Sequence, residues 1–271
     1  MKQVGRRMDG LSLHYYTIPT GNWDRGRKGS ATRFGEDQYF STLRNTLQMD
    51  ELVTRHSAIM DVYDPEKRVG LVVDEWGVWT DVEPDTNPGF LYQQNSMRDA
   101  ILAALNFNIF HRHADRVAMA NIAQMVNVLQ AMILTDNEKM LVTPTYHVFE
   151  MYKVHQDATF LPVDVKSPDY QFGDQKISAV DATASLDKNG AVHLSLVNTD
   201  PNRTVQVSCE LFGVTPKTVT GRVLTADTVQ AHNTFDQPDT VHPVSLTSFK
   251  LNDDALTVEV PSKSVVVLEL K

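Results

Sequence analysis

The chain has 271 residues, of which 42% are hydrophobic and 22% are charged, with 13 Gly and 12 Pro; this is enough for one large or two ordinary domains and excludes collagen-like, coiled-coil and disordered classes. Its 25 Lys and Arg against 34 Asp and Glu give a net charge of −9, which argues against nucleic acid or an anionic membrane as a partner. The single cysteine, Cys209, cannot form an internal disulfide, and no apolar run is long enough to span a membrane. The first residues do not lead into a secretion signal, so we expect a cytoplasmic protein.

Residues 1–158 alternate short apolar runs with helical patterns. The apolar spacing predicts strands at 11–16, 69–73 and 117–120 and helices at 40–63, 97–108 and 145–155. Residues 69–73 are apolar at every position, which is typical of a strand buried on both faces of a parallel sheet. Three strand–helix units in this order need parallel strands joined by crossover helices, so the first part of the chain is predicted to be α/β.

Residues 159–271 have a different pattern, with short alternating runs separated by Asn, Asp, Gly and Pro. This pattern predicts an all-β domain, an antiparallel β-sandwich. The predicted strands are 176–186, 191–197, 204–212, 217–224, 256–260 and 264–270.

The α/β part is too short for a closed architecture. A (β/α)₈ barrel needs eight strand–helix units, which at about 50 residues each would take roughly 400 residues. Three units leave a parallel sheet with two open edges. A glycine-rich phosphate loop, which would point to a nucleotide-binding sheet, is not found. The sequence therefore suggests that part of the architecture is missing.

The stretch LVVDEWGVW, residues 71–79, carries the most chemical information. A buried strand that ends in Asp74 and Glu75 places charge at the edge where α/β proteins form their active sites. Strand alternation predicts that Asp74 and Glu75 point to opposite faces, so that only one of them faces a pocket. The local pattern does not decide which one, and both could instead cap the following helix or bind an arginine.

Aromatic and histidine side chains stand close to these carboxylates in the predicted fold. His14 and Tyr16 end the first strand, where they could hold a carboxylate in its ionised form. The same sequence pattern is also consistent with an ordinary buried His and Tyr that have only a structural role. Trp79 could stack on a sugar ring or pack against a helix.

Other chemistries find weaker candidates. His111 and His113 with Asp115 have no third ligand at a metal-binding spacing, and they end a helix, where positive charge suits the dipole, so we predict no metal and no cofactor. Cys209 lies in a predicted sandwich strand, and a Gly-x-Ser-x-Gly turn is not found. Carboxylate chemistry is the remaining option.

Four stretches, DGLSLHYYT, LVVDEWGVW, HADRVAMANIAQMVNVLQA and TPTYHVFEMYKVHQ, resemble the C-terminal half of α-L-arabinofuranosidases of glycoside hydrolase family 51. The resemblance runs in order from Asp9 to His155. It implies the C-terminal part of a (β/α)₈ TIM barrel followed by the β-sandwich. It also implies a retaining hydrolase that releases terminal α-L-arabinofuranosyl groups from arabinan, arabinoxylan and arabino-oligosaccharides.

The resemblance also assigns roles to individual residues. Glu75 corresponds to the catalytic nucleophile, which selects it over Asp74. Tyr16 corresponds to a tyrosine that hydrogen-bonds the nucleophile, with His14 and Asp74 as supporting groups. Trp79 and Gln124 correspond to residues that line the arabinose subsite.

The acid/base glutamate of the family follows an Asn on an earlier barrel strand, and this chain offers no match for it. Asn137-Glu138 lies in a polar turn after a helix, and Glu83 is expected to be a solvated loop charge. We therefore expect the isolated chain to be inactive or very weak. The alternative is a non-catalytic carbohydrate-binding or assembly fragment. Two kinds of protein partner remain possible: further copies of this chain in a homo-oligomer, or a second chain that supplies the missing N-terminal half.

Overall fold

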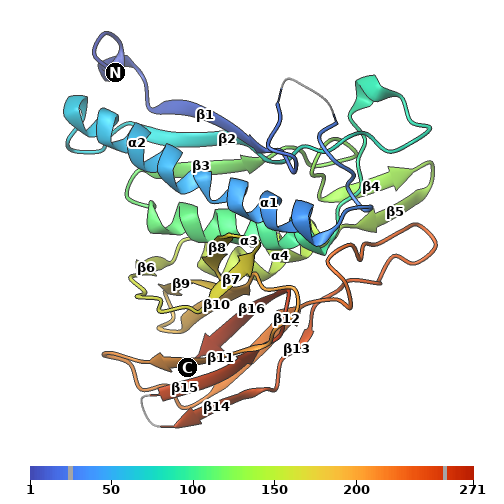
Figure 1. The fold of residues 1–271 in the computed structure, drawn as a ribbon. Coiled ribbons are helices and arrows are strands. Elements are labelled where there is room, and N and C mark those ends of the chain that lie inside the picture. Colours follow the sequence, from blue (N-terminus) through green and yellow to red (C-terminus); the bar gives the residue numbers. More distant parts are fainter. Residues whose placement is uncertain (24–26, 253–254) are drawn as a thin grey trace.

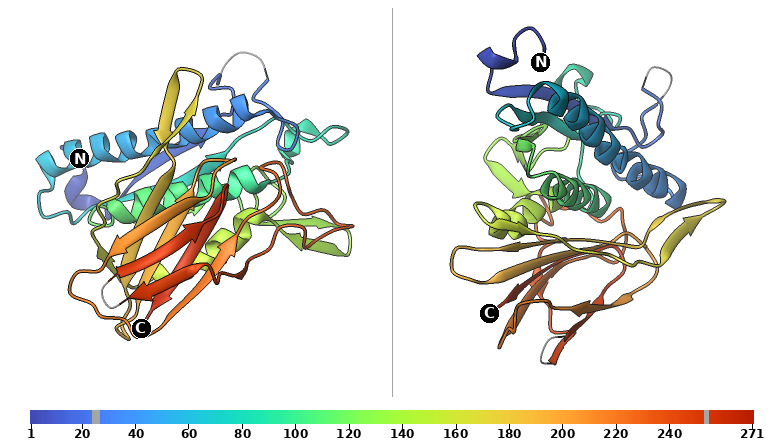
Figure 2. Two further views of the ribbon diagram at one scale, coloured as in Figure 1. Left: turned by 60° about the horizontal axis from the view of Figure 1, so that its bottom comes forward. Right: turned by 90° about the vertical axis from the view of Figure 1, so that its left-hand side faces the viewer.

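The computed structural model of the protein describes residues 1–23, 27–252 and 255–271. Its elements form stacked layers, with a parallel sheet on one side, helices in the middle and two antiparallel sheets on the other side (Figures 1 and 2). None of the helices in these described ranges is both long and apolar enough to cross a membrane.

The parallel sheet has the strand order β1-β2-β3. The strands are β1 (Gly10–Thr17), β2 (Gly70–Val78) and β3 (Val117–Ile122). The helices that follow the strands are α1 (Glu36–Thr46), α2 (Gln48–Tyr63), α3 (Met97–Arg112) and α4 (Pro144–Tyr152). Three parallel strands with crossover helices confirm the predicted α/β order.

Only one face of this sheet is covered within the described residues. Leu71, Val73 and Trp76 of β2 are fully buried in a hydrophobic core with the helices. On the opposite face Ser12 is exposed and Val72 only half-buried. The prediction that β2 is buried on both faces is therefore wrong for the described structure, because no helix covers the second face.

The single helix predicted over residues 40–63 is two helices, α1 and α2, joined at Leu47. Just before the junction, the hydroxyl groups of Thr42 and Thr46 donate hydrogen bonds to the carbonyl oxygens four residues earlier. Such bonds compete with the helix ladder and bend helices. Thr46 also contacts Thr17 of β1, so the junction lies near the end of that strand.

A hairpin that the sequence analysis missed follows β3. Strands β4 (Ile133–Asp136) and β5 (Lys139–Val142) pair through a turn in which Asn137 has a φ of 51°. An Asp-Asn pair suits such a turn because Asn tolerates the left-handed region. The neighbouring Glu138 therefore belongs to a hairpin turn.

The predicted sandwich is confirmed as a six-stranded sheet with the order β13-β12-β16-β10-β9-β6, packed on a three-stranded sheet β11-β15-β14. A third pair, β7-β8, is separate. The run predicted as one strand from residue 176 to 186 is split between β8 and β9. The bounds are β6 (Thr159–Leu161), β7 (Asp169–Phe172), β8 (Gln175–Ser178), β9 (Val180–Leu186), β10 (Val192–Asn198), β11 (Val205–Glu210), β12 (Val219–Leu224), β13 (Val244–Ser245), β14 (Phe249–Asn252), β15 (Ala255–Val260) and β16 (Ser264–Leu270).

The helices and the six-stranded sheet share one hydrophobic core. Val265 and Val267 of β16 belong to the same buried cluster as Ile101 and Leu105 of α3. Helix α3 contacts β2 and β3 on one side and β9, β10 and β16 on the other. The position of the parallel sheet is therefore fixed against the sandwich through α3.

Candidate active site

Strand β2 contains one residue more than either of its neighbours at the position of the two carboxylates. Against β1, Val72 pairs with Ser12 but Glu75 pairs with His14, and against β3 the register shifts in the same segment. An extra residue of this kind is a β-bulge, which re-aims the side chains on either side of it.

The bulge places Asp74 and Glu75 on the same open face of the sheet. The buried hydrophobic side chains of β2 are those of Leu71, Val73, Trp76 and Val78, so their spacing changes from two to three across the carboxylates. The prediction that Asp74 and Glu75 point to opposite faces is therefore wrong, because strict alternation is interrupted at the bulge.

His14 lies between the two carboxylates. Its Nε2 is 3.1 Å from Asp74 Oδ1 and its Nδ1 is 3.3 Å from Glu75 Oε2. The side chains of Asp74 and Glu75 are 40% and 43% exposed, so both carboxylates remain accessible. The imidazole can thus orient both groups at once.

Two hydroxyl groups from β1 complete the hydrogen bonds of these carboxylates. Ser12 Oγ donates to Asp74 Oδ1 at 2.6 Å, and Tyr16 Oη donates to Glu75 Oε2 at 2.8 Å. The Ser12 hydrogen bond is the main reason why the pKa of Asp74 is lowered. Burial, then the hydrogen bond to Glu75, raises the pKa of Tyr16 well above its usual value of 10.0. At neutral pH Tyr16 is therefore a hydrogen-bond donor and Asp74 is an anion.

Two aromatic rings, those of Trp79 and Trp23, extend the site beyond Tyr16. The Tyr16 and Trp79 ring centroids are 5.1 Å apart, and the Trp79 and Trp23 centroids are 5.4 Å apart, both edge-on. Trp23 is 53% exposed, and Lys28 Nζ lies 5.4 Å from the Trp79 ring centroid. Trp23 and Lys28 are not predicted as site residues from the sequence; a tryptophan in a polar stretch soon after a strand end was the available signal.

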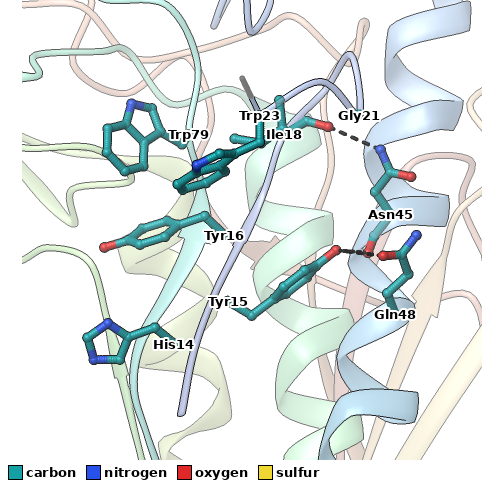
Figure 3. A pocket seen from close by; sticks show the side chains of 9 residues that line it. All are labelled: His14, Tyr15, Tyr16, Ile18, Gly21, Trp23, Asn45, Gln48 and Trp79. Atoms are coloured by element: carbon teal, nitrogen blue, oxygen red, sulfur yellow. Dashed lines mark hydrogen bonds between the residues drawn. The ribbon is translucent and has the colours of Figure 1, made fainter. Parts of the chain in front are cut away.

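These rings line a pocket of about 510 Å³. Figure 3 shows Tyr16, Trp23 and Trp79 grouped together on one side of β1, while Tyr15 points to the other side, toward Asn45 and Gln48. The pocket therefore runs along the edge of β1 rather than only over its open face. Glu75 is not a lining residue but is linked to the pocket through the Tyr16 hydroxyl.

The remaining predicted residues lie in different places. Gln124 follows β3 at the carboxyl end of the sheet and is exposed, but it does not line the pocket. His111 Nδ1 lies 3.3 Å from Thr183 Oγ1, whereas His113 Nε2 lies 2.8 Å from Asp50 Oδ1, so the two histidines have different surroundings. Glu83 accepts a hydrogen bond from the backbone of Gln94.

Comparison with known proteins identifies the family to which this chain belongs. A family model described as the α-L-arabinofuranosidase C-terminal domain matches residues 74–264. This chain therefore belongs to the α-L-arabinofuranosidases, and more narrowly to the C-terminal part of those in glycoside hydrolase family 51.

Individual relatives support this assignment. The chain is 47% identical to an intracellular exo-α-L-arabinofuranosidase of Bacteroides ovatus, and the match covers 100% of this chain and 52% of the relative. It is 26% identical to an intracellular exo-α-(1→5)-L-arabinofuranosidase of Streptomyces lividans, over 95% of this chain and 39% of that protein. The crystal structure of a family 51 arabinofuranosidase from Xanthomonas axonopodis pv. citri superposes with a TM-score of 0.97 at 51% identity and covers 100% of this chain and 54% of that one. The chain thus spans between 39% and 54% of the length of these relatives.

Proposed function

We propose that this chain carries the nucleophile half of a retaining α-L-arabinofuranosidase active site, with Glu75 as the nucleophile. The observation that supports this role is the accessible Glu75 carboxylate, held by the Tyr16 hydroxyl and the His14 imidazole beside an aromatic pocket. Glu75 would attack the anomeric carbon and form a covalent arabinosyl-enzyme, which water then hydrolyses.

A retaining hydrolase also needs a second carboxyl group, roughly 5 to 5.5 Å from the first, which protonates the leaving oxygen. Asp74 is close enough to be considered, since both carboxylates contact His14. Its lowered pKa makes it a poor acid, however, because an ionised carboxylate has no proton to donate. We therefore place the acid/base group in the part of the relatives that this chain does not span.

We further propose that residues 1–158 form three βα units of a (β/α)₈ barrel and that residues 159–271 are a C-terminal sandwich domain. An uncovered face is unusual for a parallel sheet, and the described strands β1 and β3 each have one edge outside the pairing. Closing the barrel would cover the exposed face of the sheet and would pair the free edges of β1 and β3. A further strand beside β1 would occupy part of the pocket that runs along this edge.

The expected substrates are arabinan, arabinoxylan and smaller oligosaccharides that carry terminal α-L-arabinofuranosyl groups. The names of the relatives support this class of substrate and also an intracellular location. Trp79 is proposed to stack on the sugar, and Gln124 to bind it from the end of β3. The roles of Tyr16, Trp79 and Gln124 in binding arabinose remain part of this proposal.

The decisive experiment uses a 2-fluoro-arabinofuranosyl compound with a dinitrophenolate leaving group, which departs without general acid help. We expect the chain to be labelled once, at Glu75, as located by mass spectrometry. Glu75→Gln should not be labelled, whereas Asp74→Asn should still be labelled, more slowly. An unactivated arabinoside should turn over roughly 10² to 10⁴-fold more slowly than with an intact acid/base pair.

The same experiment tests the alternative of a non-catalytic binding or assembly fragment. Binding of arabino-oligosaccharides by calorimetry, with no labelling of wild type, would favour that alternative and contradict the nucleophile role of Glu75. Restoration of turnover by adding the N-terminal half of the Bacteroides ovatus relative would support the shared barrel.

A further inference from the structure

Lys28 does not line the pocket itself but lies beside it, next to the lining residue Trp79, and its backbone is held by several hydrogen bonds. Its N–H donates to Asp81 Oδ1 at 2.9 Å, and its carbonyl oxygen accepts from the Thr20 N–H at 3.3 Å. The next residue, Gly29, donates to Asp81 Oδ2 at 3.3 Å and accepts from the Asp81 N–H at 2.9 Å. These hydrogen bonds attach the segment at Lys28 and Gly29 to Asp81, in the segment that follows β2.

The Lys28 ammonium group points to the ring of Trp79. The distance of 5.4 Å from Nζ to the ring centroid is within the range of a cation–π interaction. The backbone N–H of Trp79 donates to the Thr17 carbonyl oxygen at 2.9 Å, and the Trp79 ring packs edge-on against the rings of Tyr16 and Trp23. The backbone hydrogen bonds of Lys28 and the packing of the Trp79 ring place the positive charge beside the aromatic part of the pocket.

Three of the described carboxylates near this pocket are engaged with other groups. Asp74 and Glu75 contact His14, and the Asp81 carboxylate accepts the backbone N–H groups of Lys28 and Gly29. Its place beside the Trp79 ring positions the Lys28 ammonium to bind an anionic group of a ligand that rests on the rings.

The path from Lys28 to the nucleophile passes through two rings. Lys28 contacts Trp79, Trp79 contacts Tyr16, and Tyr16 donates to Glu75. A sugar attacked by Glu75 would lie at the Tyr16 end of this path, so a neighbouring sugar unit would come within reach of Lys28. The carboxylates at the Glu75 end would repel an anion, which fixes the direction in which such a ligand can lie.

We propose that Lys28 is a specificity-determining residue that favours glycans with a carboxylate, such as a uronic acid, on a sugar beside the arabinofuranosyl group. This inference rests on the proposed function because it assumes that the pocket binds a glycan. It names a substrate class, acidic arabinose-bearing oligosaccharides, that a chain with a net charge of −9 would otherwise repel.

Calorimetric titration of the full chain with two matched ligands tests this proposal. The ligands are an arabinoxylan oligosaccharide that carries one glucuronic acid and the same oligosaccharide as its neutral methyl ester. An accessible ion pair of this kind changes affinity about two- to five-fold, so wild type should bind the acid that much more tightly than the ester at low salt. Raising the ionic strength should reduce the preference.

Three variants separate the charge from its structural effects. Lys28→Met should bind both ligands equally, Lys28→Arg should keep the preference for the acid, and Lys188→Met, which removes one charge from an exposed turn of the sandwich, should not change it. An equal loss of affinity for both ligands in Lys28→Met would show that Lys28 only supports Trp79 and would overturn the proposal. Labelling of Glu75 without any preference for the acid would overturn this inference alone, whereas no binding and no labelling would overturn the proposed function with it.

Discussion

Tyr16 connects the carboxylate site to the aromatic pocket through a single side chain. Its hydroxyl donates to Glu75 while its ring contacts Trp79 and Trp23. A phenol can do both only while it keeps its proton. Burial and the neighbouring Glu75 carboxylate raise the pKa of Tyr16, so the hydrogen bond is maintained throughout the neutral and mildly alkaline range.

This coupling between Tyr16 and Glu75 can be measured directly. Glu75→Gln should lower the pKa of Tyr16 but leave it above the usual value of 10.0, because burial, the larger cause, is unchanged. The measurement is an alkaline ultraviolet titration in which Tyr16→Phe identifies the contribution of this phenol. An unchanged Tyr16 titration in Glu75→Gln would contradict the hydrogen bond.

At the scale of single elements, β2 depends on Gly77 as well as on its bulge. Gly77 has a φ of 140°, and a Cβ atom there would lie 3.1 Å from Oε1 and 3.3 Å from Cβ of Gln130. Gln130 cannot easily move, since Oε1 accepts the Val78 N–H at 2.7 Å and Nε2 donates to the Asp99 carbonyl oxygen at 2.8 Å.

Gly77→Ala should therefore destabilise the chain by about 2 to 4 kcal/mol, which combines backbone strain with a contact against an immobile side chain. Urea unfolding would measure the difference. Gly173→Ala is the matched control, because Gly173 also has a positive φ, 61°, but has open space around it, so its cost should be only about 1 kcal/mol. An equal loss of unfolding free energy in Gly77→Ala and Gly173→Ala would show that the Gln130 side chain moves to make room for the added methyl group.

The sequence could predict the strands and helices of the α/β part because their apolar spacing is set by burial against α3 and the core. It could not predict the bulge in β2, since the extra residue is defined by the pairing of β2 with β1 and β3 rather than by any residue type. The β4–β5 hairpin was missed because its strands are only four residues long.

The same limit applies to the candidate site. The carboxyl ends of neighbouring parallel strands meet, which is why Tyr16 and His14 could be expected near Glu75 from the residues alone. Trp23 and Lys28 reach Trp79 through the path of a loop, and loop paths depend on contacts such as those of Asp81 that have no periodic signal. The assignment of Glu75 rather than Asp74 came from the resemblance and stays a prediction.

At the scale of the whole molecule, a cluster of histidines lies between the helices and the six-stranded sheet. Both ring nitrogens of His155 lie 2.7 Å from serine hydroxyls, one from Ser185 of β9 and one from Ser195 of β10. The His111 ring centroid, from α3, is 4.9 Å from that of His155. Burial, with the nearby His111 and His193, lowers the pKa of His155 to about 3, and burial next to Arg112 lowers the pKa of His111 to about 4.

These lowered pKa values predict that acid weakens the joint between the two parts of the chain. Below pH 6.5 the unfolded chain binds protons at both histidines, whereas the folded chain does so only near pH 4 and pH 3, so stability is fully present above pH 6.5 and is lost as the pH falls. At about pH 5 the loss should be on the order of 1 to 2 kcal/mol for each histidine.

Urea unfolding at neutral pH and at about pH 5 would measure this loss, and His155→Gln should reduce it because the amide keeps polar contacts with both serines without taking up a proton. Since Val265 and Val267 of β16 share one core with α3, the helices and the sandwich should unfold in a single transition at both pH values. Two separate transitions in acid would instead mean that protonation releases the sandwich from the helices before either part unfolds.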